Sequence, residues 1–587
     1  MRTSTSPRWL ASVAVTTVVV MSAWAVLDRR AAAQTQAPAA IYVNGKFVTV
    51  DRAFSYAEAV AIDGGKFTAV GTTAAIRTLA GPRTTVVDLK GRTVVPGFAD
   101  SHIHNAGGGP GVDLSRVRTM KELLDAVAVR VKQSPPGEVI VTNSDWHEAQ
   151  ITEQRVPLRA DLDTVSPNNP VVVVRGGHEY ILNSAALKKW RISKETPELP
   201  GGRISRSADG EPNGELVDRA RNLVTLPPPS PKTLDERIQD QIAEYQKLHA
   251  AGLTTIRYGG SSVEHYKLLE EMKRRGVLTM RVVFLFRPDR DAPASAIPDI
   301  VKSWNVAPNG GDEWLRVGGA KLIIDGGFEG GLFRDPYLPP FDEGGTFRGI
   351  QVMPTDRYTD TVKALNRLGW RAFTHTVGDA AMDIVLAAYE AADAERPLAG
   401  RRWGIEHGFM AQPEHFARIS RMGLGVTVQN HLYLAGPVMA KYWGLKRASW
   451  TTPVRAYIDH GIPVASGTDS GVVPYPPLWT FYHFVTRDTI TGGVMGADQK
   501  ITREEAMRSA TVGNAWFTFE EHTKGTIEPG RLADMVVLAE DIMTVPEKRI
   551  EQMQVLMTMT GGKVVYEHES LSARRSPRWQ EWRTTSK

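Results

Sequence analysis

The chain has 587 residues, a formal net charge of +5 and no cysteine. Its composition, 42% hydrophobic and 23% charged, is typical of a globular protein, and its length exceeds that of one ordinary core. The lack of cysteine excludes disulfides, thiolate metal ligands and a cysteine nucleophile. Basic residues are spread along the chain without a dense basic stripe, which argues against nucleic acid as a partner.

The first 35 residues resemble a targeting segment rather than part of a fold. Arg2 and Arg8 precede an apolar run from Trp9 to Leu27, and small residues follow at 31–34. This order predicts a secretory signal peptide over residues 1–35. Because the run is long for a signal, a retained membrane anchor is the alternative. In both cases we expect an exported protein, periplasmic or secreted, that contacts a membrane only through a retained anchor.

Both ends of the remaining chain contain short β-rich runs separated by tight turns. We expect residues 40–92 and 520–567 to build one composite β-sandwich, followed by a loosely held tail over 568–587. The turns expected to close hairpins lie at Asn44-Gly45, Gly64-Gly65, Lys90-Gly91 and Gly561-Gly562.

Residues 93–515 alternate strands with amphipathic helices, for example the helix expected over 234–252, and this alternation favours parallel β/α units. A large insertion is expected at about 110–230. The predicted strands of the main unit are 94–99, 254–259, 280–286, 320–325, 371–376, 403–408, 425–430 and 463–469. Eight strands close a (β/α)8 barrel, so the predicted fold class is α/β, a TIM-like barrel with a composite β-sandwich domain.

The first predicted barrel strand leads into two histidines, His102 and His104, separated by one residue. Side chains alternate along a strand, so both point to the same face, as does Asp100. The carboxyl end of a barrel strand is where barrel enzymes carry their active sites. Taken alone, the two histidines need not bind a metal, because one could pack in the interior and the other could face solvent.

Three later strands also end in residues that can bind a metal: His375, His407 and Asp469. A catalytic metal needs several protein ligands and an open position for water. Four histidines and an aspartate exceed the needs of one such ion, which predicts one or two divalent ions. Zinc is the default, although manganese, iron, nickel or cobalt would also suit nitrogen and oxygen ligands.

Lys321 lies in an apolar strand, in register with Val317, Ile323 and Asp325. A lysine facing a barrel interior is costly unless it is paired or altered. It either forms an ion pair with Asp325 or another carboxylate, or reacts with carbon dioxide to give a carbamate (N6-carboxylysine) that bridges two metals.

Several stretches resemble the amidohydrolase superfamily, and within it the YtcJ-like amidohydrolase 3 family of metal-dependent hydrolases. They are VVPGFADSHIH, GAKLIIDGG, THTVGDAA, IEHG, GTDSG and GTIEPGRLADMVVL, and with the hairpin-rich start they cover about residues 40–567. The resemblance implies that His102 and His104 bind one metal, that Lys321 is often carboxylated, that His375 and His407 bind the second metal, and that Asp469 is a ligand and the general base.

The resemblance also implies hydrolysis of a non-peptide C–N bond in an amide, N-acyl compound or cyclic amide. A divalent ion would supply hydroxide near neutral pH, and Asp469 would move the proton to the leaving group. An ester, lactone or carbamate hydrolase is the alternative, and so is a non-catalytic ligand-binding barrel. The complete set of ligands favours catalysis. A further alternative is a site that binds one metal ion, with Lys321 unmodified.

Two further histidines are candidates for contact with the small-molecule substrate. His431 follows the seventh barrel strand, and His178 lies in the insertion. Residues 145–147, Asp-Trp-His, are expected to wall the pocket. Each histidine could instead be a hydrogen-bonded loop residue. Assembly into an oligomer is left open.

Overall fold

The computed structural model describes residue 1 and residues 37–228, 230–473 and 476–572. The predicted signal or anchor segment and most of the predicted tail therefore lie outside the described residues. Within the described part, none of the helices combines the length and the apolar character needed to span a bilayer.

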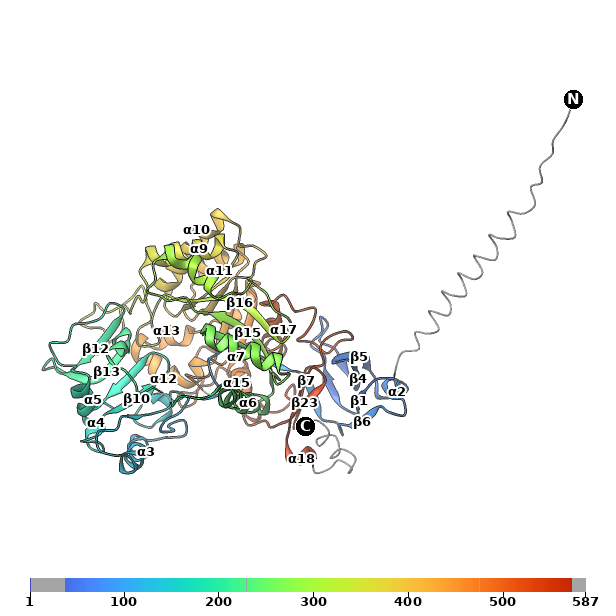
Figure 1. Cartoon of the computed structure of the whole chain (residues 1–587), viewed down its shortest axis with the longest axis horizontal. Coiled ribbons are helices and arrows are strands. Elements are labelled where there is room, and N and C mark those ends of the chain that lie inside the picture. The colour runs from blue at the N-terminus through green and yellow to red at the C-terminus, as the bar shows by residue number, and fades with distance from the viewer. Residues whose placement is uncertain (2–36, 229, 474–475, 573–587) are drawn as a thin grey trace.

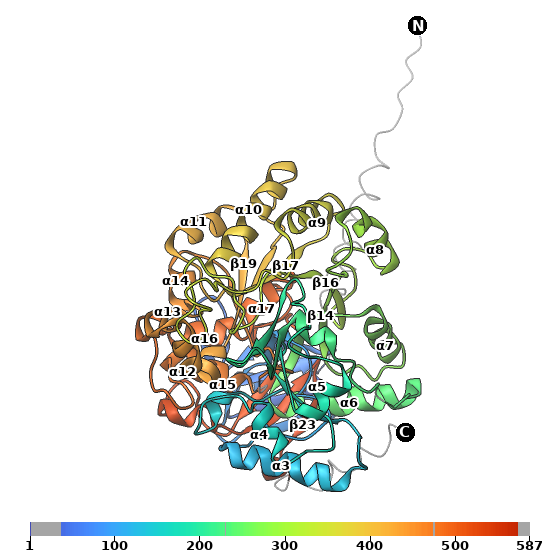
Figure 2. The same ribbon diagram turned by 90° about the vertical axis from the view of Figure 1, so that its left-hand side faces the viewer.

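Eight parallel strands form the central sheet, and helices surround it (Figure 2). The (β/α)8 architecture expected from the sequence is confirmed. In sheet order the strands are β20 (Val464–Gly467), β19 (Gly425–Gln429), β18 (Gly404–His407), β17 (Ala372–Thr376), β16 (Leu315–Ile323), β15 (Arg281–Phe286), β14 (Leu253–Ser261) and β8 (Phe98–Ile103). The surrounding helices include α6 (Leu234–Ala250), α7 (Val263–Arg274), α9 (Thr355–Arg367), α10 (Asp379–Glu395) and α11 (Pro413–Arg421).

The sheet closes on itself just beyond β20, where the chain runs beside the end of β8. The amide of Asp469 donates to the carbonyl of His102 at 2.7 Å, and the amide of His104 donates to the carbonyl of Ser470 at 2.7 Å. We call these two hydrogen bonds, with the isolated bridge between Ile103 and Ser470, the closing seam. The seam places three predicted metal ligands on adjacent stretches of backbone.

The predicted first barrel strand, 94–99, is wrong in its position. Residues Thr93–Pro96 form β7 of the terminal sheet, and the barrel strand β8 starts only at Phe98. Proline cannot donate a ladder hydrogen bond, and a continuous apolar run does not show where a chain changes sheet. At Gly97 the chain passes from one sheet to the other, and a Cβ there would lie 2.2 Å from Oγ1 of Thr254.

The two chain ends meet in a sandwich of two sheets. One sheet has the order β23-β22-β21-β7-β2-β3 and so joins strands from both ends, and the other has the order β5-β4-β1-β6. Phe47, Phe67, Met535 and Met557 belong to the apolar cluster between them. The bounds are β1 (Ala40–Val43), β2 (Lys46–Val48), β3 (Tyr56–Ala57), β4 (Ala59–Asp63), β5 (Lys66–Gly71), β6 (Thr85–Asp88), β21 (Met535–Leu538), β22 (Val555–Thr560) and β23 (Lys563–Glu567).

Two of the four predicted hairpins are confirmed, and two are wrong. β4 pairs with β5 and β22 pairs with β23, each across its glycine turn. The turns at Asn44-Gly45 and Lys90-Gly91 instead carry the chain from one sheet of the sandwich to the other, because β1 and β6 lie in one sheet and β2 and β7 in the other. A turn motif permits the left-handed backbone but does not choose the pairing partner.

The segment between β8 and β14 builds its own layer on the side of the barrel opposite the sandwich (Figure 1). Its sheet has the order β12-β13-β11-β10-β9 and packs with short helices around a core that includes Trp146. The bounds are α3 (Met120–Gln133), β9 (Ile140–Val141), α4 (Arg159–Asp163), β10 (Val171–Arg175), β11 (Glu179–Leu182), α5 (Ser184–Lys189), β12 (Gly202–Arg206) and β13 (Pro212–Asp218).

A buried ion pair joins the barrel to the sandwich and gives a first prediction. Arg281 of β15 contacts both carboxylate oxygens of Asp534 at 2.6 and 3.0 Å, and both side chains are buried. The substitution Asp534→Ala leaves the guanidinium buried without its partner and should lower the free energy of unfolding by about 3–5 kcal/mol. Urea unfolding followed by tryptophan fluorescence measures this loss. As a control, Lys121→Ala removes an exposed ion pair with Asp125 and should leave the urea midpoint of unfolding unchanged. Equal urea midpoints for the two variants would contradict the prediction.

Candidate metal centre

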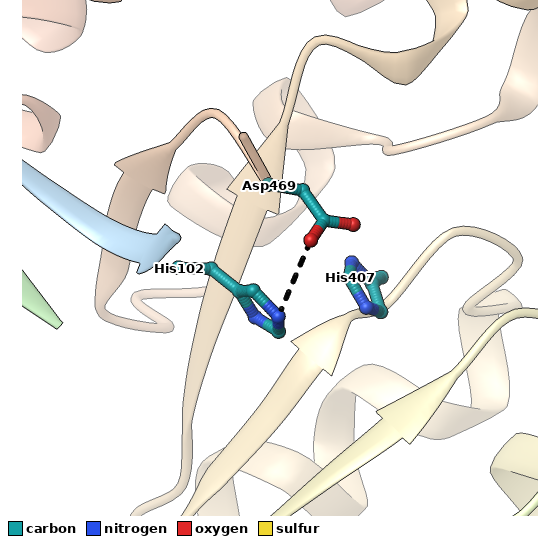
Figure 3. A group of neighbouring side chains, drawn as sticks. All are labelled: His102, His407 and Asp469. Carbon is teal, nitrogen blue, oxygen red and sulfur yellow. Dashed lines mark ion pairs between the residues drawn. The ribbon is translucent and has the colours of Figure 1, made fainter. Parts of the chain in front are cut away.

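Three predicted ligands converge at the closing seam. Nε2 of His102 lies 3.6 Å and Nε2 of His104 lies 3.2 Å from Oδ1 of Asp469. His102, His407 and Asp469 are buried, and each offers one ligand atom within 4.8 Å of the others. Figure 3 shows the side chains of His102, His407 and Asp469 directed toward one another from separate strand ends.

The other predicted ligands extend this cluster. The ring of His407 lies 4.7 Å from that of His102 and 4.6 Å from that of His375, measured between centroids. Nζ of Lys321 lies 3.2 Å from Nε2 of His102. The six side chains predicted as metal ligands therefore lie together at one rim of the barrel, and their roles as ligands stay predictions.

Hydrogen bonds fix which nitrogen of each ring faces the cluster. Nδ1 of His102 contacts the carboxylate of Glu406, and Nδ1 of His407 lies 2.7 Å from Oε1 of Gln429. Nε2 of His375 lies 3.1 Å from the carbonyl of Gly326. Each contact is to an oxygen that accepts a hydrogen bond from the ring N–H, so the opposite nitrogen keeps its lone pair. Metal-bound histidines typically donate their other ring N–H to an oxygen acceptor of this kind.

The charge state of the cluster suits a cation. Burial lowers the pKa of His102 to about 4 and those of His375 and His407 well below the usual range, so these rings are neutral. Burial alone would raise the pKa of Asp469, but His102 and hydrogen bonds from neighbouring histidines bring it well below its usual range. Neutral imidazoles around a carboxylate match the nitrogen and oxygen donors of a divalent metal.

Lys321 is buried, and burial lowers its pKa to about 8. The ion pair with Asp325 considered above does not form. Asp325 instead accepts backbone hydrogen bonds from Leu332, Val377 and Gly378. Within the described residues, no carboxylate lies within ion-pair distance of Nζ of Lys321, whose hydrogen-bond contact is His102. The lysine thus lacks the partner that would explain its burial as a structural ion pair.

Two glycines at the end of β14 make room for these side chains. A Cβ at Gly259 would lie 2.4 Å from Nε2 of His102. At Gly260, where φ is +103°, a Cβ would lie 2.8 Å from Cβ of Lys321. The second strand of the barrel therefore contributes space rather than a ligand.

Sequence reasoning missed Glu406, which lies beneath the cluster. Its carboxylate accepts from Nδ1 of His102 and, at 2.7 Å each, from Arg257 and Thr427. Strand alternation would send Glu406 and His407 to opposite faces. His407 has a φ of +69°, which breaks the alternation. A left-handed backbone at a non-glycine residue leaves no signal in the sequence. The only sequence feature that pointed to Glu406 was its position directly before His407 in IEHG.

A cavity opens beside the cluster and is lined by His375, His407 and Asp469 together with both predicted substrate histidines. Nε2 of His431 lies 3.0 Å from Oδ2 of Asp469. Nδ1 of His178 lies 2.6 Å from Oδ1 of Asp218. Burial alone would lower the pKa of His178, but the charge of Asp218 has the larger effect, so the pKa is raised above its usual value.

Aromatic and aliphatic side chains make up most of the remaining cavity wall. They include Phe328, Phe409, Val377, Val472, Val473 and, from the predicted wall segment, Trp146 and His147. Asp145 does not line the cavity and accepts a hydrogen bond from Asn143 at 2.6 Å. The cavity holds about 470 Å³ of space free of atoms, including its open mouth.

The position of Glu406 gives a second prediction. Glu406→Gln removes the acceptor that fixes the His102 ring and should weaken divalent metal binding by about 10–100-fold. Competition with a metal-binding dye measures this affinity. Glu414→Gln, on the exposed start of α11, is the matched control. Equal metal affinity in the two variants would show that Glu406 does not position the ring.

Comparison with known proteins identifies the family of this chain. The amidohydrolase family profile matches residues 85–566. The N-substituted formamide deformylase of Arthrobacter pascens is 30% identical over 556 residues, covering 91% of this chain and 99% of that protein. The putative amidohydrolase YtcJ of Bacillus subtilis (strain 168) is 27% identical over 546 residues, covering 90% and 99%. The crystal structure of an uncharacterised metal-dependent hydrolase from Pyrococcus horikoshii has a TM-score of 0.63 at 21% identity, covering 87% and 99%. The chain belongs to the amidohydrolase family.

Proposed function

We propose that this member of a metal-dependent hydrolase family cleaves a non-peptide C–N bond in a small-molecule amide, of the N-acyl or formamide type. The observation that carries the proposal is the buried group of neutral imidazoles around Asp469, which opens into a cavity lined largely by aromatic and aliphatic side chains. The similarity to an N-substituted formamide deformylase over nearly the whole of both chains supports C–N cleavage.

We assign two cation positions to the cluster. His102 and His104 would hold one ion and His375 and His407 the other, with Asp469 and a carboxylated Lys321 as further ligands. Zinc is the proposed ion, since imidazole and carboxylate donors suit it. A bound divalent cation lowers the pKa of water and polarises a carbonyl oxygen.

The protein's own groups handle the proton and the substrate. Asp469 would take the proton of the attacking water on one oxygen, while His431 holds the other oxygen at 3.0 Å. The same carboxyl would then protonate the leaving nitrogen. Nδ1 of His178 is held by Asp218, so its Nε2 is free to donate to the substrate in the cavity. The apolar wall limits the access of bulk water.

Lys321 would be carboxylated in the active protein. An amine adds carbon dioxide only in its uncharged form, releasing a proton as the carbamate forms. Burial favours that uncharged form, as the lowered pKa of about 8 shows. The missing ion-pair partner and the contact with His102 support this assignment.

Export of the protein stays a proposal that rests on the N-terminal sequence alone. The basic residues before Trp9 and the apolar run to Leu27 support a signal peptide or an anchor.

The general base gives a third prediction. Asp469→Asn removes the proton acceptor and should lower kcat for an N-substituted formamide by about 10²–10⁴-fold. Most of the bound metal should remain, because the histidines are unchanged. Metal analysis of each purified variant separates the two effects. Asp459→Asn, at an exposed position on α14 (Val454–Asp459), is the control, and a near-native rate in Asp469→Asn would reject this base.

The carbamate gives a fourth prediction. Metal-loaded protein prepared in ¹³C-labelled bicarbonate should show one carbamate carbon signal by NMR, and Lys321→Ala should lack it. Metal-free protein reloaded with zinc should regain more activity with bicarbonate than in buffer free of carbon dioxide. Equal recovery in both buffers, without a carbamate signal, would establish that Lys321 acts unmodified.

A further inference from the structure

The cavity wall contains a carboxylate that the proposed chemistry does not use. Glu329 lines the same cavity as His375 and His407, and it is only 2% exposed. Its Oε2 accepts a hydrogen bond from Nη1 of Arg175 at 2.9 Å. Its Oε1 is buried and has no hydrogen-bond partner. A buried carboxylate oxygen without a donor is costly, which indicates that a ligand supplies one.

The guanidinium beside Glu329 is already occupied. Arg175 makes two hydrogen bonds to Glu148, at 2.8 and 2.6 Å, on its other edge. Nε of Arg175 also lies 3.3 Å from Oε2 of Glu179, whose pKa burial raises well above its usual range. Burial would also raise the pKa of Glu148, but Arg175 holds it at about 2. Three carboxyl groups thus share the one charge of Arg175. The other cationic group near Glu329, His178, is already paired with Asp218, so an ammonium group would restore the balance.

The neighbours of Glu329 also suit a cation. The Phe328 ring stacks on Phe409 with centroids 5.9 Å apart, and both line the cavity. Aromatic faces attract cations, and the guanidinium carbon of Arg175 already lies over Phe328, 5.9 Å from its centroid. His147 lies 5.7 Å from Phe328 and adds no opposing charge, because burial lowers its pKa to about 3. Its Nδ1 accepts from the amide of Ala149, so its buried Nε2 carries the proton and is an unpartnered donor, whereas Oε1 of Glu329 is an unpartnered acceptor.

We propose that Glu329 recognises an ammonium group of the substrate, so that the preferred amides carry an amine in addition to the bond that is cleaved. The ammonium would donate to Oε1 of Glu329 and lie against Phe328. This inference rests on the proposed function, since it names the substrate class of the same site. Glu329 would determine specificity and take no part in moving the proton.

Matched substrates test the inference. The zinc-loaded enzyme is assayed with N-(ω-aminoalkyl)formamides of increasing chain length and with N-alkylformamides of equal length. At the best length, the aminoalkyl compound should have a kcat/KM about 10–100-fold higher than its alkyl counterpart. In Glu329→Gln this ratio should fall to about one. Glu343→Gln, an exposed charge in the same loop region, should keep the wild-type ratio.

A binding measurement separates this inference from the proposed reaction. Calorimetric titration of the same compounds into zinc-loaded protein should show tighter binding of the aminoalkyl series in the wild type and no preference in Glu329→Gln. If no formamide is hydrolysed but this preference is found, the reaction is wrong and the ammonium site stands. If formamides are hydrolysed without preference at any length, the inference is overturned. A preference for the aminoalkyl compounds that persists in Glu329→Gln also overturns the inference. If Glu329→Gln does not fold, the ratio of kcat/KM between the aminoalkyl and alkyl compounds in the wild type is the test.

Discussion

The closing seam of the barrel is the interaction on which the candidate site depends. Two backbone hydrogen bonds, from Asp469 to His102 and from His104 to Ser470, join the last strand region to the first. They bring residues separated by more than 360 positions to adjacent places through the backbone, where the side chains of His104 and Asp469 also meet at 3.2 Å. Asp469 has a φ of +61°, a conformation that costs about 1–2 kcal/mol outside glycine. Such strain is found where a side chain must be aimed at a functional site.

Below the seam, a buried polar layer sets the direction of the ligands. Glu406 connects His102 with Arg257, and Gln429 holds His407. Because these acceptors bind the ring N–H groups on the inner side, the lone pairs of the opposite nitrogens are left for the cluster. The stability of the fold and the chemistry of the rim are therefore coupled, since a change in this layer alters both the packing of the barrel and the geometry of the cluster.

Much of the fold could be predicted because parallel strands end at one rim, so that histidines at strand ends must meet. The sequence could not show where one apolar run is divided, and the break at Gly97 moved the first barrel strand from 94–99 to Phe98–Ile103. It also could not show Glu406 or Glu329, because their roles depend on a left-handed backbone at His407 and on contacts with the insertion. Turn motifs at residues 44–45 and 90–91 were visible, but their pairing depended on the distant sheet partners.

The central claim is that side chains from separate strands share divalent cations at one rim. Anomalous X-ray diffraction from crystals of the zinc-loaded protein, collected at the zinc edge, tests this most directly. The account predicts peaks at about 2.0–2.2 Å from nitrogens of His102 and His407 and from an oxygen of Asp469. Fully loaded protein whose only anomalous peaks lie away from these three side chains would contradict it.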